Sequence, residues 1–176
     1  VNESLWDKIT LTRDSISPVE IQGVLDAQLD RDARLAGNDI PTDRFIVLCV
    51  GQFIDRKGRW VFLDAARQAL ASDSSLYFVW VGPEMPSGPD LERIAEYGLD
   101  GSFKFVLSSS LGSRRQDILE FFRVADLFVL ASFLEGLPIS IIEAMALGIP
   151  TVSTNINGIP EAIIDEETGI LVEPGD

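Results

Sequence analysis

The sequence contains no histidine, one cysteine and three lysines, and each scarcity excludes a class of function. Without histidine, the chain lacks the most common general base and every Ser-His catalytic triad. With one cysteine it also lacks the ligands that a transition-metal site needs, so we expect no metal and no other cofactor. That cysteine, Cys49, lies inside an apolar run, which excludes a disulfide framework and indicates a small core residue in a cytoplasmic protein.

Long hydrophobic runs and an excess of positive charge are also missing. No apolar run reaches the roughly 18–20 residues that cross a bilayer, and no signal peptide is visible. The net charge of −14, from 28 acidic and 14 basic residues, argues against a nucleic-acid partner. The 176 residues suffice for one domain with a core, and the start at Val1 rather than Met suggests a piece of a longer protein.

Apolar strand patterns alternate with helical patterns from residue 45 onward. We expect strands over 45–50, 76–81, 103–107, 127–131, 150–153 and 169–172, and helices over 58–71, 89–97, 115–125 and 138–147. Strands that are apolar on both faces and separated by helices predict an α/β fold, a Rossmann-like doubly wound parallel sheet. The preceding polar segment, 1–44, predicts one helix, 19–35, with Ile21, Val24, Leu25 and Leu29 on its inner face.

The carboxyl ends of the strands are where such sheets bind ligands, and one loop there carries two carboxylates. Glu135 precedes the helix expected from Pro138, and Glu143 lies inside that helix within an apolar run. Free amides at a helix start bind anions such as phosphate, so the two carboxylates could grip hydroxyl groups on either side of it. The alternative is that Glu135 only caps the helix electrostatically and that Glu143 is a solvated helix residue.

Three of the four other loops at the same edge could also contribute to a site, and the remaining one is 108–113. Residues 51–58 place Arg56 and Lys57 before a helix start, where cations are unfavourable unless an anion joins them, although both could simply be solvated. Residues 82–89 could pass over a base edge or be a plain connection. Residues 154–161 include the turn signal Asn157-Gly158, again with a plain turn as the alternative. Neither a G-x-G-x-x-G nor a Walker motif is present.

Over residues 45–176 these motifs, in this order, resemble the C-terminal half of a family 4 (group 1) glycosyltransferase of the GT-B fold. The resemblance rests on Glu135-Gly-Leu-Pro…Glu143-Ala-Met-Ala…Gly148-Ile-Pro, then Thr154…Gly158-Ile-Pro-Glu161, Thr168-Gly169 and Val172-Glu-Pro-Gly-Asp176. It implies a nucleotide-sugar donor domain at 45–176, behind an interdomain linker and lead-in helix at 1–44. It also implies retaining transfer of the sugar to an acceptor hydroxyl in polysaccharide, glycolipid or glycoconjugate synthesis.

The resemblance assigns a role to each site residue. It implies that Glu143 binds the ribose hydroxyls, that Glu135 lies beside the donor sugar, and that Lys57 neutralises the diphosphate without a metal. The amides of Gly136 and Leu137 would contact sugar or phosphate, with Gly51, Gln52, Pro138 and Gly158 completing the donor site. Gln52 departs from the family, which usually has arginine there as a second diphosphate contact.

Other functions remain open, and Gln52 supports only the last of them. A sugar-nucleotide epimerase or phosphorylase-like enzyme could share this half of the fold, and a degenerate nucleotide-sugar-binding module could have lost turnover. The acceptor would be a glycan, lipid or metabolite held by an N-terminal domain absent from this chain. The fragment alone would then be inactive, and the missing domain could attach the protein to the inner membrane face.

Overall fold

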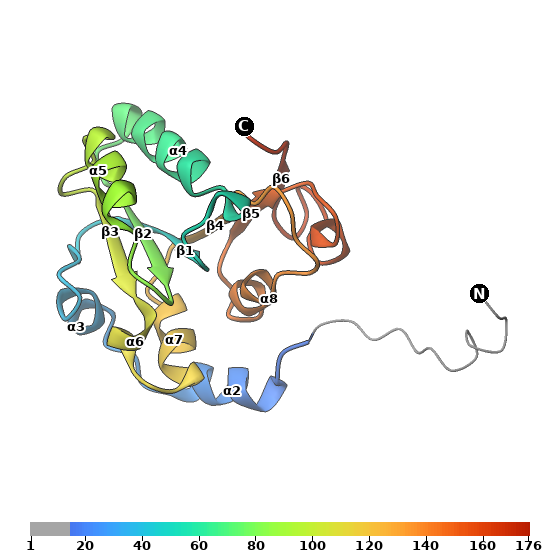
Figure 1. Ribbon diagram of the computed structural model, residues 1–176. Coiled ribbons are helices and arrows are strands. Elements are labelled where there is room, and N and C mark those ends of the chain that lie inside the picture. Colours follow the sequence, from blue (N-terminus) through green and yellow to red (C-terminus); the bar gives the residue numbers. More distant parts are fainter. Residues whose placement is uncertain (1–14) are drawn as a thin grey trace, which may run out of the picture.

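A six-stranded, wholly parallel sheet organises residues 15–176, the part of the chain that the computed structural model describes (Figure 1). Its strand order is β3-β2-β1-β4-β5-β6, so the chain runs outward to β3 and then returns to the other side of β1. This is the doubly wound order of Rossmann-like folds, as predicted. The strands are β1 (Phe45–Val50), β2 (Leu76–Gly82), β3 (Phe103–Leu107), β4 (Leu127–Leu130), β5 (Thr151–Thr154) and β6 (Ile170–Val172).

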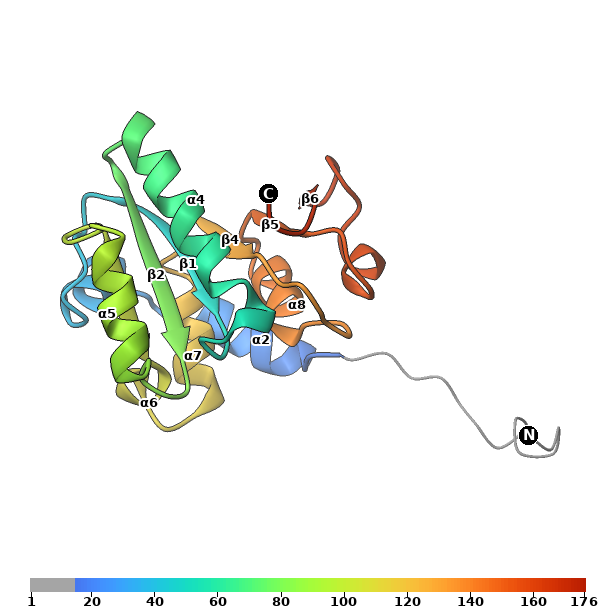
Figure 2. The same ribbon diagram turned by 45° about the horizontal axis from the view of Figure 1, so that its top comes forward.

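Helices cover both faces of this sheet. Figures 1 and 2 show α4 and α5 on one side of it, with α2 and α7 on the opposite side. The helices are α2 (Pro18–Asp26), α3 (Arg31–Ala36), α4 (Arg59–Ser72), α5 (Gly88–Glu96), α6 (Ser108–Leu111), α7 (Arg115–Phe122) and α8 (Ile139–Ala146), with 3-10 turns at η1 (Asp55–Lys57) and η2 (Ile159–Glu161). Each predicted helix from 58 onward is confirmed to within a few residues, whereas α6 and η1 were not anticipated.

The core lies along the central strands. Four consecutive residues of β1, Ile46 to Cys49, are at most 3% exposed, because helices bury both faces of the strand. Trp80 of β2 is fully buried and is the largest such side chain. Cys49 is a free, buried thiol, and its burial raises its pKa well above the usual range. Among residues 15–176, no helix is both long enough and apolar enough to span a membrane.

The single helix expected at 19–35 is wrong, because the chain forms two helices with an extended link. Ala27 and Asp30 have extended backbones, and the Asp30 carboxylate caps α3 by accepting from the Ala33 N–H at 2.9 Å. Leu25 is 41% exposed rather than inward. The extended link between the two helices is stabilised by Arg123, which is distant in sequence. Arg123 donates to the Val24 and Ala27 carbonyls at 2.6 and 2.9 Å.

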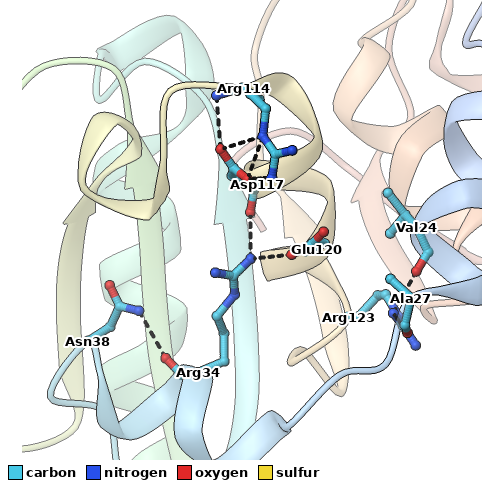
Figure 3. A network of polar contacts seen from close by, with 8 residues as sticks. All are labelled: Val24, Ala27, Arg34, Asn38, Arg114, Asp117, Glu120 and Arg123. Atoms are coloured by element: carbon cyan, nitrogen blue, oxygen red, sulfur yellow. Dashed lines mark hydrogen bonds and ion pairs between the residues drawn. The ribbon is translucent and has the colours of Figure 1, made fainter.

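Both short helices dock against α7 (Figure 3). Ile21 and Val24 of α2 pack on Leu119, forming a small apolar cluster apart from the main core. From α3, Arg34 pairs with Glu120 at 2.8 Å and donates to the Asp117 carbonyl at 3.2 Å. The described part of the expected linker, 15–44, is therefore packed on the sheet's helical layer; residues 1–14 lie outside the described part.

Candidate functional site

The loops after β1 and β4 meet where the strand order reverses, the position at which doubly wound sheets bind ligands. The two strands are neighbours although they are separated by about 80 residues, and the Ile46 N–H donates to the Asp126 carboxylate at 2.7 Å. The loops themselves are joined by a backbone hydrogen bond from the Phe133 N–H to the Arg56 carbonyl at 2.8 Å. Side chains from both loops are consequently held in one place.

Gly58 makes this close approach possible. It has a φ of +70°, and a Cβ atom there would lie 1.8 Å from the Ala131 carbonyl oxygen. Only glycine fits, both because of the left-handed backbone and because of the contact with β4's continuation. The residue before it, Lys57, is thereby directed at the loop that follows β4.

A charged cluster results. The Lys57 Nζ lies 2.6 Å from Oε1 of Glu135, and the two side chains are 14% and 6% exposed. The Ser132 hydroxyl donates to the same carboxylate oxygen at 2.7 Å. Arg56 approaches the other oxygen at 3.4 Å and donates to the Leu134 carbonyl at 3.0 Å. Lys57 is thus not a solvated turn residue, and Arg56 joins it while remaining 42% exposed.

The start of the β1 loop is shaped by its backbone. The Trp80 indole N–H donates to the Gly51 carbonyl at 2.8 Å, which fixes the loop at the end of the strand. The aliphatic part of Lys57 lies over Gly51, where a Cβ would be 3.6 Å from its Cε. Gln52 is exposed and does not join the Lys57–Glu135 cluster. It lines a pocket of about 240 Å³ between the β1 and β2 loops, together with Ile54, Arg59, Met85 and Asp90.

The β4 loop leads into α8 through Gly136, Leu137 and Pro138, with Pro138 in the N-cap position. Within residues 15–176, the amides of Gly136 and Leu137 donate to no protein acceptor. The β5 loop packs directly against this turn, because a Cβ on Gly158 would lie 2.5 Å from the Gly136 carbonyl oxygen. Three loops therefore surround the start of α8, and backbone donors remain available there.

Glu143 lies one helical turn into α8 and is only 7% exposed, so it is not a solvated helix residue. Arg115, the first residue of α7, places its Nη2 2.5 Å from Oε1 of Glu143. Burial raises the pKa of this carboxyl group, while the positive charge of Arg115 acts in the opposite direction. Glu135 and Glu143 therefore belong to two separate ion pairs on either side of the Gly-Leu-Pro turn.

Sequence reasoning named the acidic residues and Lys57 but missed the groups that hold them. Ser132 could have been noticed, because it lies just after a buried strand and three residues before Glu135, at the ligand edge. The sequence signal for Arg115 is weaker. A glutamate in the apolar run around 143 requires a cation, but nothing in the sequence indicates which one. No three His, Cys, Asp or Glu side chains within 15–176 are grouped as metal ligands would be.

Comparison with known proteins identifies the family. The family model described as "Glycosyl transferases group 1" matches residues 44–176, three quarters of the chain and the whole sheet. The chain belongs to the group 1 glycosyl transferases. It is 32% identical over 151 residues to a D-inositol 3-phosphate glycosyltransferase of Rhodococcus opacus, covering 82% of this chain and 33% of the relative. It is 34% identical over 132 residues to the alpha-D-kanosaminyltransferase of Streptomyces kanamyceticus, covering 75% and 33%.

Solved structures agree on the fold of this glycosyl transferase domain. The C-terminal domain of a group 1 glycosyl transferase, LpcC of Francisella tularensis, superposes with a TM-score of 0.70 at 27% identity, covering 86% of this chain and 78% of that domain. A glycosyltransferase of Rickettsia africae gives a TM-score of 0.78 at 22% identity, covering 97% and 44%. The Rossmann-like sheet is thus that of a GT-B C-terminal domain. This chain spans about a third of the length of the curated relatives above.

Proposed function

We propose that this chain is the nucleotide-sugar donor part of a retaining, family 4 glycosyltransferase that moves a sugar to an acceptor hydroxyl. The observation that carries the proposal is the Lys57–Glu135 pair at the switch point, with free amides beside it and a second buried carboxylate in α8. A nucleotide-sugar presents a diphosphate, a sugar and a ribose, and a cation, free amides and carboxylates are the kinds of group that bind them.

Each residue then takes one role. Glu143 accepts hydrogen bonds from the ribose hydroxyls, and Glu135 lies beside the donor sugar with the amides of Gly136 and Leu137. Lys57 binds the diphosphate, with Gly51, Pro138 and Gly158 shaping the walls around it. Glu135 already pairs with Lys57, so a bound diphosphate would share a cation that the fold has positioned in advance.

Sugar transfer requires positive charge on the protein beside the leaving diphosphate. When the bond to the sugar breaks, negative charge grows on the departing diphosphate, and cations fixed there lower the barrier. We propose that Lys57 and Arg56 supply this charge and that no metal ion or other cofactor is required. Arg56 supports this because its guanidinium also reaches the Glu135 carboxylate, although Gln52 replaces the family's usual arginine.

Gln52 favours one competing function, a module that binds nucleotide-sugars without turnover. Its neutral amide contributes roughly 1 kcal/mol per hydrogen bond, against about 1.5–3 kcal/mol for a charged donor. The position of Gln52, away from the Glu135 cluster, leaves Arg56 as the second cation near the diphosphate. Transfer is therefore the first proposal and binding without turnover the second.

The whole protein would require more than these residues. The curated relatives are about three times as long as the matched region, and their names include a D-inositol 3-phosphate glycosyltransferase and a galactosyltransferase named for GlcNAc-diphosphoundecaprenol. We propose that the acceptor here is likewise a glycan, lipid or metabolite, bound by a further domain in a cytoplasmic or membrane-associated enzyme of glycan synthesis. The 176 residues alone would bind the donor but not transfer it.

The test is calorimetric titration of the chain with UDP, GDP, ADP and NAD in parallel. We expect one nucleoside diphosphate to bind most tightly, and both Glu143→Ala and Lys57→Ala to weaken it by at least about tenfold, the loss expected for one charged hydrogen bond. Arg67→Ala, an exposed residue far along α4 that pairs with Asp64, is the matched control. Binding of NAD in preference, or of no nucleotide, would overturn the proposal.

A further inference from the structure

The carboxylate assigned to the ribose is held by an arginine that the sequence motif does not include. Glu143 has a side chain only 10% exposed, and its Oε1 receives the Arg115 guanidinium at 2.5 Å. Arg115 begins α7 and Glu143 lies one turn into α8, so the pair joins these two helices. A buried carboxylate without such a partner would be costly to ionise.

Arg115 has a second acidic neighbour from outside the matched family region. Its Nε lies 3.6 Å from Oε2 of Glu20, which is in the first turn of α2. The family match begins only at residue 44, so Glu20 belongs to the segment that leads into the domain. Arg115 of α7 therefore contacts a carboxylate of α2 and a carboxylate of α8.

The helix that carries Glu20 is firmly placed. Arg123, the C-cap residue of α7, donates to two carbonyls at the C-terminal end of α2, and Figure 3 shows this contact. Val24 is fully buried against Leu119. Glu20 is therefore positioned by the same docking that attaches the lead-in helix to α7.

We propose that Arg115 is a positioning residue for the Glu143 carboxylate, and that Glu20 of the lead-in helix holds Arg115 in the orientation that this requires. The inference rests on the proposed function, in which Glu143 accepts hydrogen bonds from the two ribose hydroxyls. It adds a residue pair, Glu20 and Arg115, to ribose recognition and makes the docked lead-in helix part of the donor site.

A carboxylate can bind an arginine and the ribose hydroxyls at the same time. An ionised carboxylate offers about four lone-pair sites on two oxygens. Arg115 occupies Oε1, which leaves Oε2 to accept from a vicinal diol. Burial raises the pKa of Glu143, Glu20 adds to that effect as a like charge, and Arg115 opposes both. Arg115 thus fixes the geometry and favours the ionised form that hydroxyl donors need.

The test compares ribonucleotides with their 2′-deoxy counterparts on the full 176-residue chain. We titrate UDP, GDP and ADP, and the 2′-deoxy form of each, by calorimetry. The unmodified chain should bind its preferred ribonucleoside diphosphate about tenfold or more tightly than the deoxy form, because the deoxy form lacks one donor to a charged acceptor. In Arg115→Gln this ratio should fall to roughly threefold or less, through loss of ribonucleotide affinity.

Three further variants distinguish a positioning role of Arg115 from an effect on folding. Arg114→Gln, a neighbouring exposed arginine that pairs with Asp117 of the same helix, should leave the ratio unchanged. Arg115→Lys should restore part of the ratio, and Glu20→Gln should give an intermediate one. Thermal unfolding of each variant identifies any that fails to fold, because a structural defect would weaken both nucleotides equally.

The outcomes are distinct. If the unmodified chain binds no nucleoside diphosphate, the proposed function fails and this inference with it. If it binds and discriminates, but Arg115→Gln discriminates equally well, the function stands and the positioning role is overturned. If Arg115→Gln loses the ratio but Glu20→Gln retains it in full, the role of the lead-in helix is overturned and that of Arg115 stands.

Discussion

Replacing Gly58 by alanine tests whether the site depends on the close contact between the β1 and β4 loops. The alanine would have to adopt a φ of +70°, which costs about 1–2 kcal/mol for a residue with a Cβ. It would also place the Cβ 1.8 Å from the Ala131 carbonyl oxygen, a distance that backbone atoms can relieve only by moving apart. Gly58→Ala should therefore separate the two loops.

The chain offers a matched control for the first of these costs. Gly98, at the end of α5, has a φ of +65°, and a Cβ added there would meet no described atom within 4 Å. Gly98→Ala should cost about 1–2 kcal/mol from backbone conformation alone. Any additional loss in Gly58→Ala measures the contact with β4.

The size of that additional loss follows from what the contact holds. Moving the loops apart weakens the Phe133–Arg56 backbone hydrogen bond, worth about 1 kcal/mol, and the buried Lys57–Glu135 pair, whose disruption costs several kcal/mol. We expect Gly58→Ala to be at least about 2 kcal/mol less stable than Gly98→Ala. In a chain of this size that corresponds to a melting temperature about 4–8 °C lower.

Urea denaturation of both variants, followed by tryptophan fluorescence, to which the buried Trp80 contributes, provides the measurement. Nucleotide titration on the folded proteins should show weaker binding for Gly58→Ala and unchanged binding for Gly98→Ala. Equal stabilities within about 0.5 kcal/mol would refute the argument, since that is the usual scatter for independent substitutions.

Three other predictions follow from the same contacts. A double-mutant cycle of Lys57→Met and Glu135→Gln should give a coupling of about 2 kcal/mol or more in urea denaturation, because each single change strands a buried partner; additive effects would contradict the pairing. Cys49 should resist thiol reagents at about pH 8 until the chain unfolds, since burial raises its pKa; rapid labelling of the native protein would count against the buried site. The raised pKa of Glu143 means that the folded state binds its proton more tightly, so the stability contributed by this group is lost as pH rises above the ordinary pKa of 4.5 for a glutamate. Relative to Glu143→Gln, the unmodified chain should lose stability as the pH rises above 4.5, and a difference that stays constant above that pH would show that the shift is absent.

The sequence was sufficient for the fold because burial on both faces leaves a clear pattern. The runs at 45–50 and 76–81 contain almost nothing polar, and helices of 3.6-residue periodicity separate them. The lead-in segment was harder. The apolar spacing across 19–35 fits one helix, but the break at 27–30 is held by Arg123, a contact across 96 residues that no local pattern contains.

Part of the candidate site could likewise be predicted from the sequence, and part could not. Glu135, Lys57 and the glycines could be named because loops at the carboxyl ends of parallel strands share an edge. The sequence does not indicate which cation pairs with which carboxylate, because the pairing depends on tertiary packing. Lys57 is directed toward Glu135 by Gly58, and Arg115 reaches Glu143 from a different helix. Local sequence thus indicates the residue types of the site, and tertiary packing decides their pairing.

The strand order has a consequence for how the protein is made. Strands β1, β2 and β3 are consecutive, so the first half of the sheet can pair while later residues are still being synthesised. The pairing of β1 with β4 closes a loop of about 80 residues and must wait until β4 has left the ribosome. Until then the nascent chain exposes one edge of β1 at the centre of its future sheet, a point of vulnerability to aggregation. The ion pair between the β1 and β4 loops can form only after β4 has paired with β1. Under the proposed function, nucleotide binding would therefore begin only once both halves of the sheet have joined.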